Sequence, residues 1–326
     1  MSDSSGLHVV TTHSNPLRYK SRDQLLDRWL QRMADARVES VVVVEVAYDD
    51  TPSRMEYLAD RVREHRMERW HENLNFVVRR TRAGMWQKER AINLGFGALP
   101  SEWKFAAWID ADVDFANPSW DDDTVAALRL HDVVQPWSHA QDLGPVSEPV
   151  GPMAQSFMYS HVTKQPAPNG RYGGKFWHPG FAWAIRRDAY EAVGGLLDTA
   201  ILGAGDHHMA LALIGKAERS IPGGMTQGYK DSVLGWQDLA ETHIKRNVGY
   251  VPGLITHGWH GNKRDRRYVE RWDTLVKYQY NPARDIRRDG EGLWDWAHTN
   301  DERMRGLRDS IWAYMKARSE DSIDVV

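Results

Sequence analysis

Cysteine is absent from the 326 residues, which excludes disulfide bonds, zinc–thiolate sites and thiol nucleophiles. Long hydrophobic runs are absent as well, because no stretch approaches the roughly 20 apolar residues that a membrane-spanning helix needs. Residues 1–6 are polar and lack the apolar segment of a signal peptide. The chain also has no excess of one charge, since 42 basic and 45 acidic residues give a formal net charge of -3. We therefore expect a cytoplasmic protein without a transmembrane anchor or a general affinity for nucleic acid.

The remaining composition is that of a globular protein. Hydrophobic residues make up 41% of the chain, which is enough for one large α/β domain or two modest ones. The 15 tryptophans are an unusually large number, and indole rings serve either as core bulk or as platforms for sugars and bases. We expect most of them in the core, and the oligomeric state stays open.

Strand-like and helix-like segments alternate in the first third of the chain. The predicted strands are Leu7–Thr12, Ser40–Val46, Asn75–Arg79 and Lys104–Ile109, and the predicted helices are Ser21–Ala36, Pro52–Trp70 and Gln87–Ala98. The run of valines in the second strand is typical of a strand buried on both faces. We expect an α/β fold with a Rossmann-like, mostly parallel sheet flanked by helices, and ligands at the carboxyl ends of its strands.

The later segments are less regular. We expect helices at Asp122–Leu130, Asp231–Asn247 and Lys263–Tyr278, and strands at Asp132–Trp137, Phe181–Ile185 and Tyr250–Thr256. The Pro- and Gly-rich connection Leu143–Trp177 is too long for a simple loop, so we interpret it as a functional segment. The tail from Asn281 is expected to pack as a helical cap.

Three acids follow the fourth strand at alternate positions, Asp110, Asp112 and Asp114. If the extended conformation continued, all three would project to one side. Such crowding raises the pKa of neighbouring carboxyls unless a cation offsets it, which indicates a divalent metal site. Oxygen ligands suit Mg²⁺ or Mn²⁺, which commonly bridge to phosphate. The alternative is a solvated acidic turn at a strand end.

A second acid, Asp206, follows the stretch Gly203–Gly205 and stands where a helix is expected to begin. Helix dipoles favour a charged carboxylate there, so Asp206 is a candidate general base. The alternative is a plain helix cap.

Two histidines three residues apart, His257 and His260, lie near the end of an apolar strand and before Lys263. Neutral imidazole completes metal shells begun by carboxylates, and a lysine beyond it can meet a phosphate. Structural histidines are the alternative. Lys88 and Asn93 lie on a polar helix and either face a donor molecule or form a solvated face.

In their order, these features resemble the metal-dependent glycosyltransferases of the GT-A fold, and are similar to the inverting galactosyl- and N-acetylgalactosaminyl-transferase type. The resemblance covers residues 7–262. It implies a GT-A catalytic domain at 1–262, with a donor half at 7–137 and an acceptor half at 138–262, followed by a helical extension at 263–326. It also implies a UDP- or GDP-sugar donor and Mn²⁺ or Mg²⁺.

The resemblance gives roles to individual residues. Asp110 is expected near the ribose or the metal, Asp112 on the metal and the diphosphate, and Asp206 as the base. Gly205 departs from the pattern, because the family has Glu there. Either His257 or His260 matches the late histidine that binds the metal. The residues expected to contact the donor are Thr11, Asn15, Arg18, Glu45, Lys88, Asn93, Asp110 and Lys263.

The implied reaction is transfer of a sugar to a hydroxyl acceptor with inversion. A nucleotidyltransferase or nucleotide-sugar hydrolase would use the same metal ion to bind the diphosphate. A non-catalytic nucleotide- or glycan-binding protein is a further alternative. Aromatic residues interleave with a basic strip made of Lys263, Arg264, Arg266, Arg267 and Arg271. The strip suits an anionic glycan or DNA with a hydroxylated base of the phage type, or else it is a solvated helix face or the phosphate end of the donor site.

Overall fold

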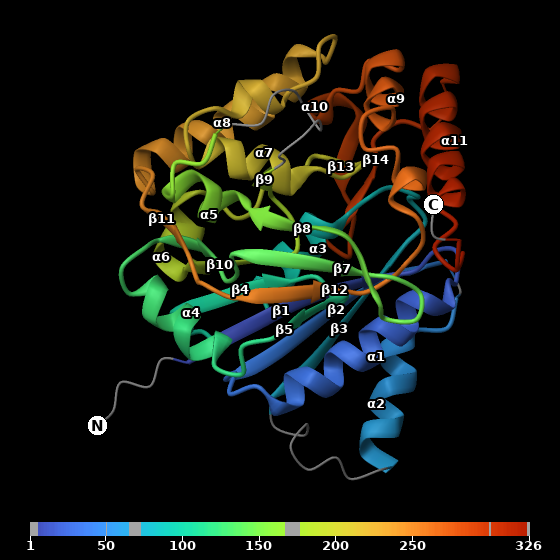
Figure 1. Ribbon diagram of the computed structural model, residues 1–326. Coiled ribbons are helices and arrows are strands. Elements are labelled where there is room, and N and C mark those ends of the chain that lie inside the picture. The colour runs from blue at the N-terminus through green and yellow to red at the C-terminus, as the bar shows by residue number, and fades with distance from the viewer. Residues whose placement is uncertain (1–5, 50, 65–72, 167–176, 300, 325–326) are drawn as a thin grey trace.

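The computed structural model describes residues 6–49, 51–64, 73–166, 177–299 and 301–324. Figure 1 shows a central sheet between helices, with α1 and α2 on one side and α7 and α8 on the other. The helices are α1 (Lys20–Asp35), α2 (Arg54–Glu64), α3 (Lys88–Phe96), α4 (Trp120–Leu128), α5 (Phe157–Val162), α6 (Arg187–Ala192), α7 (Gly205–Ala212), α8 (Gln227–His243), α9 (Arg271–Lys277), α10 (Pro282–Asp285) and α11 (Glu302–Ala317), with 3-10 turns η2 (Ala217–Ser220) and η3 (Lys263–Arg266).

The strands form a large sheet, a smaller sheet and a hairpin. They are β1 (Leu7–Ser14), β2 (Ser40–Tyr48), β3 (Leu74–Thr81), β4 (Phe105–Ile109), β5 (Val113–Phe115), β6 (Val133–Gln135), β7 (His139–Leu143), β8 (Pro149–Ser156), β9 (Trp177–His178), β10 (Ala182–Arg186), β11 (Val248–Tyr250), β12 (Leu254–His257), β13 (Ile286–Arg288) and β14 (Trp294–Trp296). The large sheet has the order β11-β6-β10-β4-β1-β2-β3, and only β10 runs antiparallel to its neighbours. This confirms the predicted mostly parallel central sheet flanked by helices.

The valines of β2 show how the large sheet is buried. Val41 and Val43 belong to the core on the α1 side, which includes Trp29. Val42 and Val44 point the other way and belong to the core that includes α3. Because side chains alternate along a strand, a run of valines fills both cores. The prediction of a strand covered on both faces is confirmed.

The smaller sheet has the order β5-β12-β7-β8-β9 and lies beside the carboxyl end of β4 (Figure 1). β12 pairs with β5, which follows Asp110 and Asp112 and contains Asp114, and with β7, whose Asp142 lies opposite His257. This pairing brings residues 110–115, 139–143 and 254–257 together although they are far apart in the sequence. The smaller sheet therefore positions the candidate site.

Three predicted segments have a different structure. The connection 143–177 contains β8 and α5, and its residues 167–176 lie outside the described ranges. The expected strand 250–256 is two strands in different sheets, because Pro252 and Gly253 cannot continue a ladder. The expected helix 263–278 is η3 followed by α9, with Arg267 at a φ of 42° between them.

The C-terminal region contains α9, α10 and α11, as the helical extension predicted, together with the β13–β14 hairpin. Leu307 and Ile311 of α11 and Trp296 of β14 are buried in the same core cluster as Val42. The extension therefore packs on the large sheet rather than standing apart. No helix within the described ranges combines the length and apolarity required to cross a bilayer.

Candidate metal centre and active site

The strand does not continue through the three acids after β4, so the predicted alignment of all three is wrong: Asp110 and Asp112 line the same cavity, and Asp114 does not. β4 ends at Ile109, and the backbone N–H of Val113 donates to the carbonyl of Asp110 at 3.1 Å, which closes a turn before β5. A turn at this point abolishes the alternation that a continuous strand would impose. Each carboxylate therefore has its own partner: Lys88 for Asp110, His260 for Asp112 and Arg32 for Asp114.

Asp112 and the two late histidines come together in a buried cluster. Asp112 Oδ2 lies 2.9 Å from His260 Nε2 and 3.6 Å from His257 Nε2. One ligand atom from each residue lies within 4.8 Å of the other two. Asp112 Oδ1 is also buried, and it has no hydrogen-bond partner in the part of the chain that the structure describes. These atoms form a nitrogen–nitrogen–oxygen set that can hold a divalent metal ion.

The proton positions on the histidines strengthen this assignment. His257 Nδ1 lies 2.9 Å from Asp142 Oδ1, and His260 Nδ1 lies 3.7 Å from Glu320 Oε2. Asp142 holds a proton on His257 Nδ1 and leaves the Nε2 lone pair of that ring for the cluster. His260 Nδ1 makes no hydrogen bond within the described residues, and His260 Nε2 accepts from Arg266 Nη2 at 3.0 Å, a contact that a metal ion would displace. The two Nε2 atoms are 3.3 Å apart. Two lone pairs at this distance repel each other unless a cation or a proton lies between them.

The charges around the cluster act differently on its two histidines. Burial would lower the pKa of His257, but Asp112 and Asp142 outweigh burial and raise that pKa. Burial would likewise raise the pKa of Asp112, yet the histidines hold it well below its usual range. Burial and the charge of Arg266 lower the pKa of His260. The carboxylates of Asp112 and Asp142 therefore favour positive charge at His257, while burial and Arg266 oppose it at His260.

A central cavity of about 470 Å³ lies beside this cluster. Several predicted site residues line it, namely Lys88, Asp110, Asp112, Asp206, His257, His260 and Lys263. The cavity is also lined by Arg266 of the basic strip and by residues that the sequence analysis missed, namely His13, Ser14, Arg22, Glu89, His178, Arg318 and Glu320. The sequence gives no local signal for Arg22 or Glu320, because each reaches the cavity only through tertiary packing.

Five predicted donor contacts lie outside the residues that line the central cavity, namely Thr11, Asn15, Arg18, Glu45 and Asn93. Thr11 Oγ1 donates to the Ile109 carbonyl, and Glu45 accepts from the backbone N–H of Arg54 at the start of α2. The Asn93 amide donates to the Leu196 carbonyl. These polar groups therefore support the backbone around the cavity.

Asp206 lies in the first turn of α7 and lines the central cavity. The helix cap is Ala204, at a φ of 74°, so Asp206 is not the cap that the alternative interpretation required. Gly180 faces it: a Cβ there would lie 2.9 Å from Asp206 Oδ2 and 3.1 Å from His178 Cε1. The missing side chain at position 180 lets the carboxylate and the His178 ring approach the same point.

Glu89 is a second carboxyl next to Asp206. A Cβ on Gly205 would lie 2.7 Å from the carboxyl carbon of Glu89, so this side chain from α3 packs directly over Gly205. Gly205 is the position where the resembling family has Glu, and here a carboxyl reaches it from another element. Burial raises the pKa of Glu89 to about 7, with Lys88 opposing the shift and Asp206 adding to it.

The raised pKa of Glu89 gives a stability prediction. Between its usual value and about pH 7 the folded protein keeps a proton that the unfolded chain releases, so stability should fall as pH rises through this window. Glu89→Gln should remove this loss and stabilise the protein at pH 8 by an amount on the order of 2 kcal/mol. Urea unfolding at pH 5 and pH 8 measures the difference. An unchanged pH dependence in Glu89→Gln would contradict the assignment.

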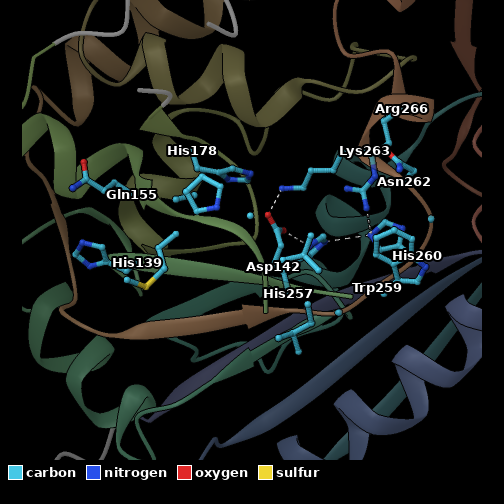
Figure 2. A pocket seen from close by; sticks show the side chains of 18 of the residues that line it. His139, Asp142, Gln155, His178, His257, Trp259, His260, Asn262, Lys263 and Arg266 are labelled. Carbon is cyan, nitrogen blue, oxygen red and sulfur yellow. Dashed lines mark hydrogen bonds and ion pairs between the residues drawn. The ribbon is translucent and has the colours of Figure 1, made fainter. Parts of the chain in front are cut away.

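A side cavity of about 760 Å³ lies between the β7–β8 hairpin and the loop after β12. Figure 2 shows His139, Gln155 and His178 at one end and Lys263, Asn262 and Arg266 at the other. Apolar residues complete the wall, namely Leu143, Val150, Pro152, Met153 and Ala154. The side cavity shares His178, His257, His260, Lys263 and Arg266 with the central cavity. The metal cluster therefore lies where the two cavities meet.

Comparison with known proteins finds similarity to solved structures and none to a family model or a curated sequence. A mannosyltransferase from Pyrobaculum calidifontis, solved with GDP-Man and Mn²⁺, has 13% identity and a TM-score of 0.46 over 95% of this chain and 74% of its own. These likenesses assign no family.

Two other solved structures are similar over part of the chain. One is 4-diphosphocytidyl-2C-methyl-D-erythritol synthase from Anaerococcus prevotii, with 13% identity and a TM-score of 0.39 over 76% of this chain and 89% of its own. The other is a glucose-1-phosphate thymidylyltransferase, described as putative, from Bacillus anthracis, solved with sucrose. It has 7% identity and a TM-score of 0.38 over 77% of this chain and 89% of its own.

Proposed function

We propose that this chain is a metal-dependent glycosyltransferase that moves a sugar from a UDP- or GDP-sugar to a hydroxyl group of an acceptor, with inversion. One observation carries the proposal: the cluster of Asp112, His257 and His260 and the carboxylate of Asp206 line the same cavity. A clamp for the leaving diphosphate and a base for the incoming hydroxyl are the two parts that such a transfer needs.

Asp112, His257 and His260 would hold the metal ion. A bound Mn²⁺ or Mg²⁺ would neutralise the charge that develops on the departing diphosphate. Two imidazole nitrogens favour Mn²⁺, because Mg²⁺ prefers oxygen ligands. Lys88, Lys263 and Arg266 line the central cavity and add positive charge beside the diphosphate.

Asp206 supplies the base. In the transfer, a bond forms between the acceptor oxygen and the anomeric carbon while the bond from that carbon to the diphosphate oxygen breaks. The acceptor proton passes to the Asp206 carboxylate, and the diphosphate leaves with the bonding electrons. Attack on the face opposite the leaving group gives inversion. The first turn of α7 fixes the carboxylate beside Gly180 at the wall of the cavity.

The side cavity is the proposed acceptor site, and its chemistry supports a glycan. Imidazole and amide groups, such as those of His139 and Gln155, line this cavity together with apolar side chains such as Met153, and they offer hydrogen bonds and packing to a sugar ring. Two of the five residues of the basic strip, Arg266 and Arg271, are buried at 8% and 9% exposure, and Lys263 pairs with Asp142, which leaves the exposed Arg264 and Arg267 for a DNA backbone. A glycan therefore fits better than DNA.

Gln155→Ala tests the acceptor site. Loss of one hydrogen-bonding amide should raise the KM for the acceptor by about 10-fold with little change in kcat. The reason is that this hydrogen bond stabilises the bound acceptor and the transition state equally. Donor binding should not change. Val146→Ser on the same hairpin is the matched control, since Val146 is 83% exposed and does not line the cavity. A rise in the KM for the donor in place of the acceptor would contradict this assignment.

A panel of nucleotide sugars tests the function itself. UDP- and GDP-sugars should raise the melting temperature in the presence of Mn²⁺ but not in EDTA, because a ligand that binds only the folded state stabilises it. Incubation with the stabilising donor and a glycan library should then yield a glycoside. Release of free sugar or pyrophosphate without a glycoside would favour the hydrolase or nucleotidyltransferase, and binding without turnover would favour a non-catalytic protein.

A further inference from the structure

The last described residues of the chain fold back onto the candidate site. This C-terminal strap, residues 318–324, follows α11 and reaches α1, where Asp321 accepts from the backbone N–H groups of Lys20 and Ser21 at 3.0 and 2.8 Å. It also holds the loop after β12, because Trp259 Nε1 donates to the Ser322 carbonyl at 2.7 Å. The strap therefore ties the loop that carries His260 to α1.

Gly261 shows how closely the strap fits this loop. The residue has a φ of 83°, and a Cβ there would lie 2.9 Å from Glu320 Cα and 3.1 Å from the Arg318 carbonyl. These contacts are with backbone atoms, which cannot move aside as a flexible side chain can. The strap and the loop are therefore packed without space between them, and the position of one fixes the other.

Glu320 is the residue of the strap that faces the metal cluster. It is 1% exposed, and Oε2 lies 3.7 Å from His260 Nδ1. Two arginines hold its carboxylate in place: Arg22 Nη2 donates to Oε1 at 2.8 Å and Arg318 Nε donates to the same atom at 2.6 Å. A buried carboxylate with two guanidinium partners has a fixed position and a fixed charge.

Asp142 and Glu320 thus lie behind the two histidines, Asp142 within hydrogen-bond distance of His257 Nδ1 at 2.9 Å and Glu320 at an ion-pair distance of 3.7 Å from His260 Nδ1, which has no hydrogen-bond partner within the described residues. Asp142 faces Nδ1 of His257, and Glu320 faces Nδ1 of His260, while both Nε2 atoms face Asp112. A carboxylate behind a ligating imidazole fixes the tautomer and the ring orientation and strengthens the ligand.

We propose that Glu320 is a positioning residue for metal binding, which sets the tautomer and orientation of His260 from the C-terminal strap. The inference rests on the metal site of the proposed function and extends it to a residue beyond the stretch that resembles glycosyltransferases. It implies that the C-terminal strap supports metal affinity through Glu320, although no described residue of the strap contributes an atom to the metal cluster.

Mn²⁺ titration followed by electron paramagnetic resonance tests the inference without any turnover. Glu320→Gln should weaken Mn²⁺ binding by about 10- to 100-fold, as the loss of an outer partner of a ligand does. Asp142→Asn should weaken it to a similar extent through His257. Asp321→Asn is the matched control, since it loosens the anchor on α1 but leaves the partner of His260 in place, and its Mn²⁺ affinity should stay within about threefold of wild type.

A second measurement needs no variant of Glu320, and so does not depend on that variant folding. Imidazole ¹⁵N spectra of the wild-type protein, with His260→Gln used for assignment, should show His260 as the tautomer protonated on Nδ1. A proton on Nε2 would overturn the inference, as would a folded Glu320→Gln with unchanged Mn²⁺ affinity. If wild type binds no Mn²⁺ at all, the proposed function fails together with the inference.

Discussion

Asp206→Asn is expected to lower the rate of sugar transfer by about 10²- to 10⁴-fold, the usual effect of removing a general base. The amide has nearly the same shape as the carboxylate and cannot take the acceptor proton. Asp206 contributes no atom to the metal cluster, so donor and Mn²⁺ binding should stay close to wild type. The measurement is kcat at saturating donor and acceptor, with donor binding followed separately by calorimetry.

The control for this variant is Asp132→Asn. Asp132 lies before β6, pairs with Arg186 and lines neither cavity, so its replacement should leave kcat unchanged. Transfer at a nearly wild-type rate in Asp206→Asn with normal donor binding would eliminate Asp206 as the base. Glu89, which packs over Gly205, would then be the next carboxylate to test.

Asp112→Asn is expected to weaken Mn²⁺ binding by about 100-fold or more. Loss of a residue that only hydrogen-bonds to a metal ligand lowers metal affinity by about 10- to 100-fold, and loss of a ligand itself lowers it further. The carboxylate is the only anionic member of the cluster. Without it, the charge that attracts a cation between the histidines is gone. Binding of UDP or GDP should then lose its dependence on Mn²⁺, which calorimetry with and without EDTA measures.

Asp114→Asn is a close control for Asp112→Asn. It removes an acid two residues further along the chain that pairs with Arg32, outside both cavities. Mn²⁺ affinity should therefore stay at the wild-type value. Equal losses in the two variants would indicate that the acids act through general charge and not through a defined metal shell.

The large sheet was predictable because its signals are local. A run of valines such as 41–44 fills two cores whatever the rest of the chain does, and alternation of strands and helices implies parallel pairing. Asp112 and one of the late histidines, His257 or His260, were also predictable as partners, since acids and histidines at strand ends are the residue types that bind metals. Their closeness in space results from the pairing of β12 with β5, which no local sequence pattern specifies.

Tertiary contacts account for what the sequence did not predict. Asp114 lies apart from Asp110 and Asp112 because a turn follows Ile109, and a strand pattern carries no sign of that turn. Glu320 lies in the tail, about sixty residues after His260, and reaches it only because α11 packs on the large sheet. Asn93 and Glu45 are polar residues whose side chains bond within the protein, Asn93 to the Leu196 carbonyl and the Tyr190 hydroxyl and Glu45 to the start of α2.

Anomalous diffraction from crystals grown with Mn²⁺ and UDP or GDP tests the central claim most directly. The account predicts a manganese peak about 2.0–2.3 Å from a carboxylate oxygen of Asp112 and from Nε2 of His257 and His260, in contact with the diphosphate. A diphosphate bound in the central cavity without manganese at these three residues, or manganese bound elsewhere in the protein, would contradict it.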